Sequence, residues 1–317
     1  MKFGLWVTAN HPADADMTQV FHDLAEQVRL ARDVGFSIVT SGQHYLTAPS
    51  QRLQTLPLLA RLAADAGHME IGTSVLLLPL HNPVDIAEQV ATLDVMTNGR
   101  FILGLGLGNV DIEYQAFGVD RRRRASRFEE SLEVMKLLWQ GGEVEFQGRY
   151  FTVPKTTAMA IPVQKPYPRL WLGGGSEAAI RRAGRLGHVW FPGGGGGIEP
   201  LLPQLAIYHA ALSEFGNPAP DDFPVSSWVY LSEDREQAMS EAHHFLGAQY
   251  DREEFERRTQ TQLIVGTPEQ GVERVREYQE RLGATYMICR LQAAGMAQEQ
   301  VLRTIRLLGE RVLPEVQ

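Results

Sequence analysis

The feature that most constrains this 317-residue chain is the segment from residue 70 to residue 108. An apolar run over residues 71–78 leads into the loop 79–83, which has the sequence PLHNP. The pattern predicts an amphipathic helix after the loop, and then a second apolar strand that ends in alternating glycines. Two strands joined by a crossover helix form the unit from which parallel α/β sheets are built. The segment therefore predicts an α/β fold.

The same alternation of strand and helix continues along most of the chain. Strands are predicted at residues 2–8, 36–41, 70–77, 101–107, 169–172, 189–191, 225–231 and 285–291. Apolar residues at helical spacing follow most of these strands. Eight such strands favour a (β/α)8 TIM barrel over a doubly wound sheet, which about six strands would satisfy. We expect a single domain over residues 1–317, with insertions at about 143–154 and 245–263.

The two insertions differ in character, and several helix ends are visible in the sequence. Residues 143–154 alternate around a Gln-Gly pair and predict a β-hairpin. Residues 245–263 are charged and contain one glycine, and we interpret them as a lid. Asn82 can cap the third helix, Gly99 can end it, and a capping box is predicted at Thr267.

Composition and charge exclude several classes of protein. The formal net charge is -8, whereas nucleic acids and anionic membranes require a basic face. The basic run at residues 121–124 precedes a glutamate-rich helix and predicts a solvated or interface role. No apolar stretch reaches the roughly 18 residues of a membrane span. The N-terminus predicts a strand and not a signal peptide, and the single cysteine, Cys289, lies in an apolar run. We expect a cytoplasmic protein that binds neither nucleic acid nor membrane.

The functional site of a (β/α)8 barrel lies at the carboxyl ends of its strands, so the candidate residues are those directly after each strand. His44 follows the second strand and is a candidate acid–base residue, with a hydrogen-bonded wall residue as the alternative. His81 is expected to be structural. No metal-ligand spacing of histidines and carboxylates occurs, so we predict no catalytic metal. Arg290 is the arginine nearest a candidate strand end, and the sequence favours a small, neutral, apolar organic substrate.

Three glycine clusters follow predicted strands. Gly174, Gly175 and Ser176 lie between a strand and a helix, where main-chain N–H groups can bind phosphate; a tight turn with a serine cap is the alternative. Residues 104–108 lack the G-x-G-x-x-G spacing of dinucleotide-binding folds, and no clean helix start follows them. They leave room for a flat ring or for close packing of strands. The glycines at 193–197 predict a surface loop or a gate beside the ligand.

Several of these motifs together resemble the bacterial-luciferase-like family of flavin-dependent monooxygenases. They are GQHY at residues 42–45, the run ending in LPLHNP at 73–83, NGRF at 98–101 and GGS at 174–176. The resemblance covers essentially the whole chain. It implies a (β/α)8 barrel that binds reduced FMN or, in some branches, a deazaflavin.

The resemblance also implies roles for individual residues. His44 matches the catalytic histidine of the family. The positions matched to cofactor binding are Trp6, Ser74, Val75, Gly106, Asn109, Gly174, Gly175, Ser176 and Trp190. Within this set, residues 74–75 match a cis peptide bond beneath the flavin ring, 174–176 match the phosphate cradle, and the two tryptophans match apolar walls. Gln43 and Leu107 stand where luciferase has a glutamate and an arginine, so phosphate binding would depend more on the glycine backbone.

The activity implied is that of a flavin-dependent monooxygenase, an oxidoreductase that uses reduced FMN and oxygen on a small apolar substrate. No second nucleotide motif occurs in the chain, so we expect a separate flavin reductase to supply the reduced flavin. A homodimer is also implied. Two alternatives remain open. One is a deazaflavin-dependent oxidoreductase that transfers hydride on the same fold, and the other is a catalytically silent flavin-binding protein.

Overall fold

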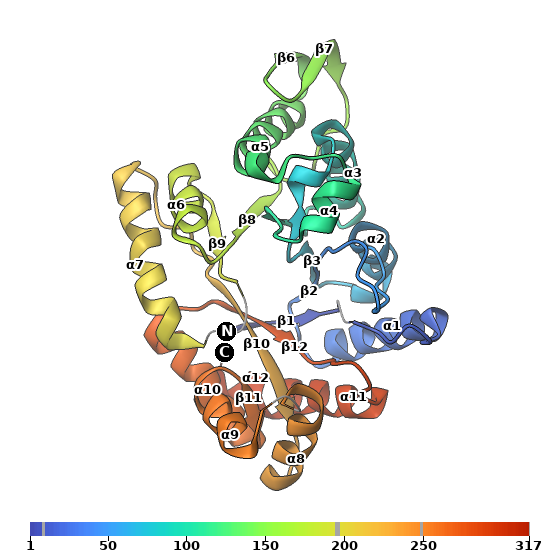
Figure 1. Ribbon diagram of the computed structural model, residues 1–317, viewed down its shortest axis with the longest axis vertical. Helices are drawn as coiled ribbons and strands as arrows, with labels where there is room; N and C mark the ends of the chain where they lie inside the picture. Colours follow the sequence, from blue (N-terminus) through green and yellow to red (C-terminus); the bar gives the residue numbers. More distant parts are fainter. Residues whose placement is uncertain (8–9, 194–196, 248–249, 317) are drawn as a thin grey trace.

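The computed structural model describes residues 1–7, 10–193, 197–247 and 250–316. Its centre is a curved parallel sheet (Figure 1). The main strands are β1 (Lys2–Trp6), β2 (Ile38–Ser41), β3 (Glu70–Thr73), β5 (Phe101–Gly106), β8 (Arg169–Gly173), β9 (Val189–Phe191), β10 (Pro224–Leu231) and β12 (Tyr286–Arg290). Their order is β10-β12-β1-β2-β3-β5-β8-β9, and β9 and β10 approach each other at the two ends. This is the cyclic order of a (β/α)8 barrel, and the predicted fold class is confirmed.

Four further strands complete the described sheets. The strand β4 (Leu76–Leu77) extends the third strand beside β5, and β11 (Ile264–Gly266) pairs with the second half of β10. The hairpin predicted at 143–154 is present as β6 (Gly142–Gln147) and β7 (Thr152–Ala158), which pair antiparallel. In Figure 1 this hairpin projects from the barrel beyond α5 (Arg124–Gln140).

Helices cover the outer side of the curved sheet (Figure 1). The longer ones besides α5 are α1 (Met17–Asp33), α2 (Thr55–Ala66), α3 (Pro83–Met96), α6 (Glu177–Leu186), α7 (Ile198–Glu214), α8 (Arg235–Leu246), α9 (Arg252–Thr261), α10 (Pro268–Leu282) and α11 (Gln298–Leu307). Shorter helical segments are η1 (Leu78–Leu80), α4 (Asp111–Ala116), η2 (Arg121–Arg123), η3 (Leu308–Val312) and α12 (Leu313–Val316). None of the described helices has both the length and the apolar character needed to cross a membrane.

The predicted helix ends are mostly correct. The side chain of Asn82 accepts the Val84 N–H at 2.9 Å, which caps α3, and the capping box at Thr267 is present. The end predicted for α3 at Gly99 is wrong, because the helix ends three residues earlier and Thr97 is its C-cap. Gly99 instead lies in the turn that follows, where its φ of 75° favours glycine.

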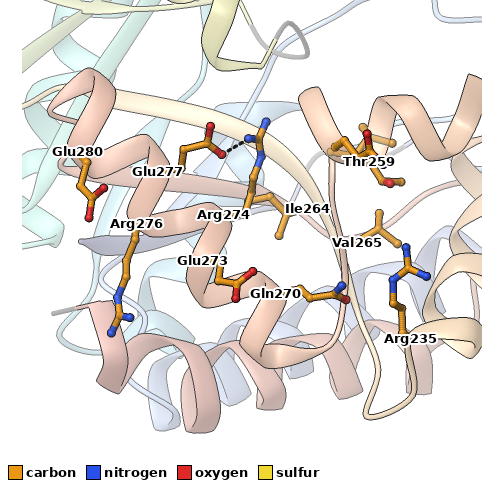
Figure 2. A pocket seen from close by; sticks show the side chains of 12 residues that line it. Arg235, Thr259, Ile264, Val265, Gln270, Glu273, Arg274, Arg276, Glu277 and Glu280 are labelled. Atoms are coloured by element: carbon orange, nitrogen blue, oxygen red, sulfur yellow. Dashed lines mark hydrogen bonds and ion pairs between the residues drawn. The ribbon is translucent and has the colours of Figure 1, made fainter.

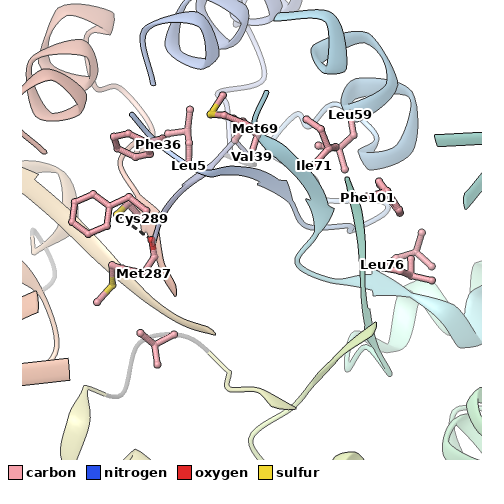
Figure 3. Packing of buried hydrophobic residues seen from close by; sticks show 14 of the residues in the cluster. Leu5, Phe36, Val39, Leu59, Met69, Ile71, Leu76, Phe101, Met287 and Cys289 are labelled. Atoms are coloured by element: carbon pink, nitrogen blue, oxygen red, sulfur yellow. Dashed lines mark hydrogen bonds between the residues drawn. The ribbon is translucent and has the colours of Figure 1, made fainter. Parts of the chain in front are cut away.

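Side chains of the strands alternate between two cores. Outward-facing residues such as Leu5, Val39 and Ile71 pack against the helices and form the larger core, as Figure 3 shows on the convex side of the strands. Inward-facing residues form a smaller cluster, which comprises Ile38, Ile102, Trp171, Phe191, Tyr286 and Ile288. The fully buried Cys289 faces the helices, and burial raises the pKa of its thiol, so it is a small core residue.

Charged residues close the amino end of the barrel. Arg169 pairs with Glu70 and lies 3.4 Å from Asp222. The hydroxyl of Tyr286 accepts from Lys2 and donates to Glu70, each at 2.9 Å. These contacts join β1, β3, β8 and β12 at their first residues. A functional site is therefore expected at the opposite end of the barrel, where the strands end.

Candidate functional site

His44 lies directly after β2 at the carboxyl end of the barrel. Its Nδ1 is 3.0 Å from Oε1 of Glu113, and the same oxygen accepts the main-chain N–H of Tyr45 at 2.7 Å. The side chain of Glu113 has no exposed surface, whereas that of His44 is 36% exposed. Because a carboxylate only accepts hydrogen bonds, Nδ1 carries the proton and Nε2 is the basic nitrogen of the neutral ring. The buried carboxylate thus orients an imidazole that can exchange a proton with a ligand.

Glu113 is the main candidate site residue that the sequence motifs did not indicate. It lies in α4, a six-residue helix that begins at Asp111, so the prediction that no helix starts after the glycines at 104–108 was wrong. The second oxygen of Glu113, Oε2, is buried and has no partner among the described residues. The signal in the sequence was an acidic residue in the first turn of a helix that follows a strand end.

A polar network lies beside this pair. Gln43 accepts the Leu77 N–H at 3.1 Å and a hydrogen bond from Nε2 of His81 at 2.8 Å, and it donates to the hydroxyl of Tyr45 at 2.9 Å. Burial lowers the pKa of His81 to about 4, so its ring is neutral at pH 7. Burial, and then the charge of Glu113, raise the pKa of Tyr45. The network therefore holds the loop after β4 against the residues that follow β2.

Residues 74 and 75 form a shelf at the mouth of the barrel. The Ser74-Val75 peptide bond is cis. A Cβ placed at Gly106 would lie 2.5 Å from Cγ2 of Val75, and one at Gly173 would lie 2.8 Å from Cγ1. The valine side chain therefore occupies the space that both glycines leave. Of the two readings of residues 104–108, close packing is the one that applies at Gly106.

The barrel interior contains buried polar atoms that have no partner among the described residues. They are Nε1 of Trp6, Oγ1 of Thr40, Oγ of Ser74, Nε1 of Trp171 and Oγ of Ser226. Thr40 lies two residues after the inward-facing Ile38, and Ser226 pairs with the inward-facing Ile288, so both hydroxyls face the interior. Each unsatisfied buried group costs about 1–3 kcal/mol. A flavin ring, which has carbonyl oxygens and ring nitrogens on its edges, fits such a set of groups.

The glycine turn after β8 lies on another part of the same rim. Gly174 has a φ of 152°, and a Cβ there would lie 2.6 Å from Cβ of Ala179, so the turn requires glycine. Ser176 caps α6 by accepting the Ala179 N–H at 3.4 Å. Gly175 and Ser176 are exposed, as is Asn109 after β5. The serine cap of the turn interpretation is therefore present, and the start of α6 is open to an anion, as the phosphate interpretation requires.

Trp190 does not lie where the sequence analysis expected the wall of a ring pocket. It is fully buried outside the barrel, with ring centroids 5.8 Å from Tyr208 and 5.7 Å from Phe223. Its Nε1–H donates to the carbonyl oxygen of Gly174 at 2.7 Å, which supports the glycine turn from behind. Its neighbour Phe191 faces the interior instead. The two neighbours face opposite sides of the sheet because side chains alternate along a strand.

Two hollows are lined in part by residues of the 245–263 insertion. A cavity of about 500 Å³ opens beside Trp6 at the mouth of the barrel, and Arg290 lines it together with residues of the 245–263 insertion. A second hollow, of about 550 Å³, lies outside the barrel among α9, β11 and α10. Figure 2 shows an ion pair among the charged side chains that line this outer hollow, between Arg274 and Glu277. Because the site of a (β/α)8 barrel lies at the carboxyl ends of its strands, the cavity beside Trp6 is the candidate for a ligand.

Two other expectations concern the rim, and a third concerns metal binding. Residues 194–196 of the glycine run and residues 248–249 of the insertion lie outside the described residues. The described part of the insertion consists largely of α9, and its action as a lid stays a prediction. In the part of the chain that the structure describes, no group of histidine, cysteine, aspartate and glutamate side chains could hold a metal ion.

Comparisons with known proteins identify the family. A family model described as luciferase-like monooxygenase matches residues 1–285. The chain belongs to the luciferase-like monooxygenase family. The resemblance stated from the sequence motifs is confirmed, and the assignment identifies the chain as an oxidoreductase.

Relatives within the luciferase-like family use two kinds of cofactor. The oxygenase component of the flavin-dependent trigonelline monooxygenase of Acinetobacter baylyi is 24% identical, over 80% of this chain and 73% of its own length. The F420-dependent glucose-6-phosphate dehydrogenase of Microbacterium testaceum is 29% identical, over 90% of this chain and 91% of its own. The oxygenating constituent of 3,6-diketocamphane monooxygenase from Pseudomonas putida, solved in complex with FMN, has a TM-score of 0.85 at 18% identity and covers 100% and 99% of the two chains.

Proposed function

We propose that this luciferase-like protein is the oxygenase component of a flavin-dependent monooxygenase, which uses reduced FMN and oxygen to oxidise a small organic substrate. The observation that supports this most directly is the set of unpaired polar atoms in the barrel interior, together with the His44–Glu113 pair after β2. These atoms need hydrogen-bonding partners that a flavin ring can supply. The name of the Acinetobacter relative supports the same assignment.

The proposal assigns each part of the flavin to residues of the rim. Ser74, Val75 and Gly106 would lie beneath the ring, with Trp6 and Asn109 at its edges. The turn at 174–176 would bind the phosphate through main-chain N–H groups and the serine hydroxyl. Trp190 would act through Gly174 and not by direct contact. When bound, reduced flavin supplies the electrons with which oxygen is activated and one oxygen atom is transferred to the substrate.

The residues of the chain would contribute water exclusion and proton transfer. Large apolar side chains of the interior, among them Trp171 and Phe191, exclude water from the barrel. Nε2 of His44 is positioned to accept or return a proton at a substrate oxygen, while Glu113 stabilises the protonated ring through Nδ1. The partly exposed imidazole and the buried carboxylate suit these two roles.

Partners follow from the same proposal. The reduced flavin would arrive from a separate reductase, because the chain contains no second nucleotide motif. We also propose a homodimer in the cytoplasm. The end of α3 supports the dimer, because Val95 and Met96 are each 56% exposed beside a groove between α2 and α3.

A second candidate function is hydride transfer with a deazaflavin. The observation that favours it is also the His44–Glu113 pair, because a histidine backed by a buried carboxylate can remove the proton of an alcohol as hydride leaves its carbon. The F420-dependent relative from Microbacterium supports this alternative.

An anaerobic titration tests the proposal. Reduced FMN, reduced riboflavin and reduced deazaflavin F420 are titrated separately into the full-length protein, and dissociation constants are measured from the change in tryptophan fluorescence. We expect reduced FMN to bind more tightly than F420, and we expect the Ser176→Ala variant to lose part of the preference for FMN over riboflavin. Tight binding of F420 without binding of FMN would replace the monooxygenase proposal with the hydride-transfer one.

Activity then separates an enzyme from a silent flavin-binding protein. A flavin reductase is added with a set of candidate organic compounds, and substrate-dependent oxygen consumption is measured for the wild type and for the His44→Asn variant. Loss of the substrate-dependent part in the variant is the expected result. Equal consumption by both proteins would favour the catalytically silent alternative.

A further inference from the structure

The cavity beside Trp6 has a composition that the proposed function does not explain. It lies at the carboxyl ends of β1, β10 and β12, and aromatic side chains such as Trp6 and Trp228 form part of its wall. Three arginines also line it, namely Arg52, Arg258 and Arg290. Among the described residues that line the cavity there is no aspartate or glutamate. A cavity of about 500 Å³ with cations and no anion is unusual unless a ligand supplies the negative charge.

Arg290 is the least compensated of the three. It lies at the last position of β12, and its guanidinium stacks over the ring of Trp6 at 4.6 Å from the centroid. Its Nε is buried and has no partner among the described residues, and no ion pair of Arg290 is found there. Burial, and then the charge of Arg52, lower the pKa of Arg290. Both effects disfavour the charged form, and the negative charge of a bound anion would oppose them.

Arg52 approaches the same space from the loop before α2. Its Nε donates to Oδ1 of Asn10 at 2.6 Å, which leaves the other guanidinium nitrogens for a ligand. Arg258 differs, because it pairs with Glu254 at 2.9 Å and stacks over Tyr250. The positive charge available in the cavity therefore comes from Arg52 and Arg290.

Arg52 also lies close to the acid–base pair. The loop that carries Arg52 is tied to His44, because Nε2 of Gln54 donates to the carbonyl oxygen of His44 at 3.0 Å. The charge of Glu113 raises the pKa of Arg52, against the larger effect of burial. A ligand held by Arg52 would therefore lie within reach of the same charges that act on His44.

We propose that the substrate of this protein carries a carboxylate or a sulfonate group, which Arg52 and Arg290 bind in this cavity. Guanidinium groups bind such oxyanions through paired N–H donors, and Trp6 and Trp228 offer the apolar body of the molecule a flat surface. This replaces the neutral substrate expected from the sequence. The inference rests on the proposed function for the assignment of the cavity to the substrate, but binding of the anion does not require flavin.

The phosphate of the cofactor is the other possible source of an oxyanion. The glycine turn proposed for that phosphate follows β8. Four strands (β1, β2, β3 and β5) separate β8 from β12 in one direction around the barrel, and two (β9 and β10) separate them in the other. The two anion sites would thus be distinct. This gives the experiment a way to tell substrate binding from cofactor binding.

Binding of small probe molecules to the flavin-free protein tests the inference. Benzoate, benzenesulfonate and the neutral benzyl alcohol are titrated by calorimetry into the wild type and into the Arg290→Met and Arg52→Met variants. We expect both anions to bind the wild type at least tenfold more tightly than benzyl alcohol, and the difference to fall below threefold in either variant. Arg290→Lys, which keeps the charge, should retain part of the difference. Arg276→Met is the matched control, because Arg276 is exposed on α10 and pairs with Glu315, and it should keep the full difference.

Two results would overturn the inference. One is equal affinity of the wild type for the charged and the neutral probes. The other is loss of the preference for FMN over riboflavin in Arg290→Met, which would mean that the arginines bind the cofactor. Failure of both flavins to bind would refute the proposed function but would leave the probe experiment standing. Unfolding curves of each variant confirm the fold, and Arg52→Met serves as the second test if Arg290→Met does not fold.

Discussion

Replacing Gly106 with alanine tests how the shelf at the mouth of the barrel is built. The added methyl would lie 2.5 Å from Cγ2 of Val75, well inside ordinary van der Waals contact. Val75 cannot avoid it by turning toward β8, because its Cγ1 already occupies the space above Gly173, 2.8 Å from where a Cβ would lie. Gly106→Ala must therefore displace the valine or the main chain that carries it. Overpacking of this kind costs about 1–3 kcal/mol.

The companion substitution Val75→Ala measures how strongly residues 75 and 106 are coupled. Alone it removes two methyl groups from a half-buried position, which costs about 1–2 kcal/mol. In the double variant the new methyl of residue 106 enters the space that the valine left. The double variant should therefore be more stable than the sum of the single effects predicts, by about 1–2 kcal/mol.

Urea denaturation of the four proteins, followed by circular dichroism, measures the free energies of unfolding. Gly175→Ala is the control, because a Cβ at that position meets no described atom within 4 Å, and it should change the stability little. The reasoning would be refuted by strictly additive effects, or by a Gly106→Ala variant as stable as the wild type. Either result would mean that Val75 does not fill the space above the glycine.

Two further predictions concern the acid–base pair and the network beside it. Glu113→Gln should lower kcat by about 100-fold with a smaller change in KM, since the amide cannot stabilise a protonated His44. Steady-state kinetics measures both constants, and the exposed Glu273→Gln is the control. If Glu113→Gln were as active as this control, the role assigned to Glu113 would be wrong. Burial lowers the pKa of His81 to about 4 in the folded protein, from its ordinary value of 6.5. As the pH falls, the unfolded chain therefore takes up a proton at His81 before the folded protein does, and the stability decreases between about pH 6.5 and 4. His81→Asn should reduce the pH dependence of the unfolding free energy in that range by up to about 1.4 kcal/mol per pH unit, and an unchanged slope in urea titrations would contradict the assignment.

Local pattern was sufficient for much of the fold. The strand at 101–107, the hairpin at 143–154 and the capping box at Thr267 depend on residues close together in the chain, whose alternation and end signals are visible in the sequence. Since parallel strands place their carboxyl ends on one side of a barrel, the position of His44 followed from the same pattern. The same reasoning gave the wrong end for α3 and missed the start of α4, because single turns and caps shift helix ends by a few residues.

The sequence by itself thus determined the order of the elements, the end of the barrel at which a site is proposed and the histidine that stands there. Only the tertiary structure decided what surrounds that histidine. Glu113 reaches His44 across 69 residues of sequence, and Arg52 and Arg290 meet from opposite parts of the chain. The register of the strands also decided on which side of the sheet Trp190 lies. It likewise decided that Val75 fills the space above Gly106. Such contacts depend on how distant strands are aligned, and a one-residue shift would reverse which side chains face the interior.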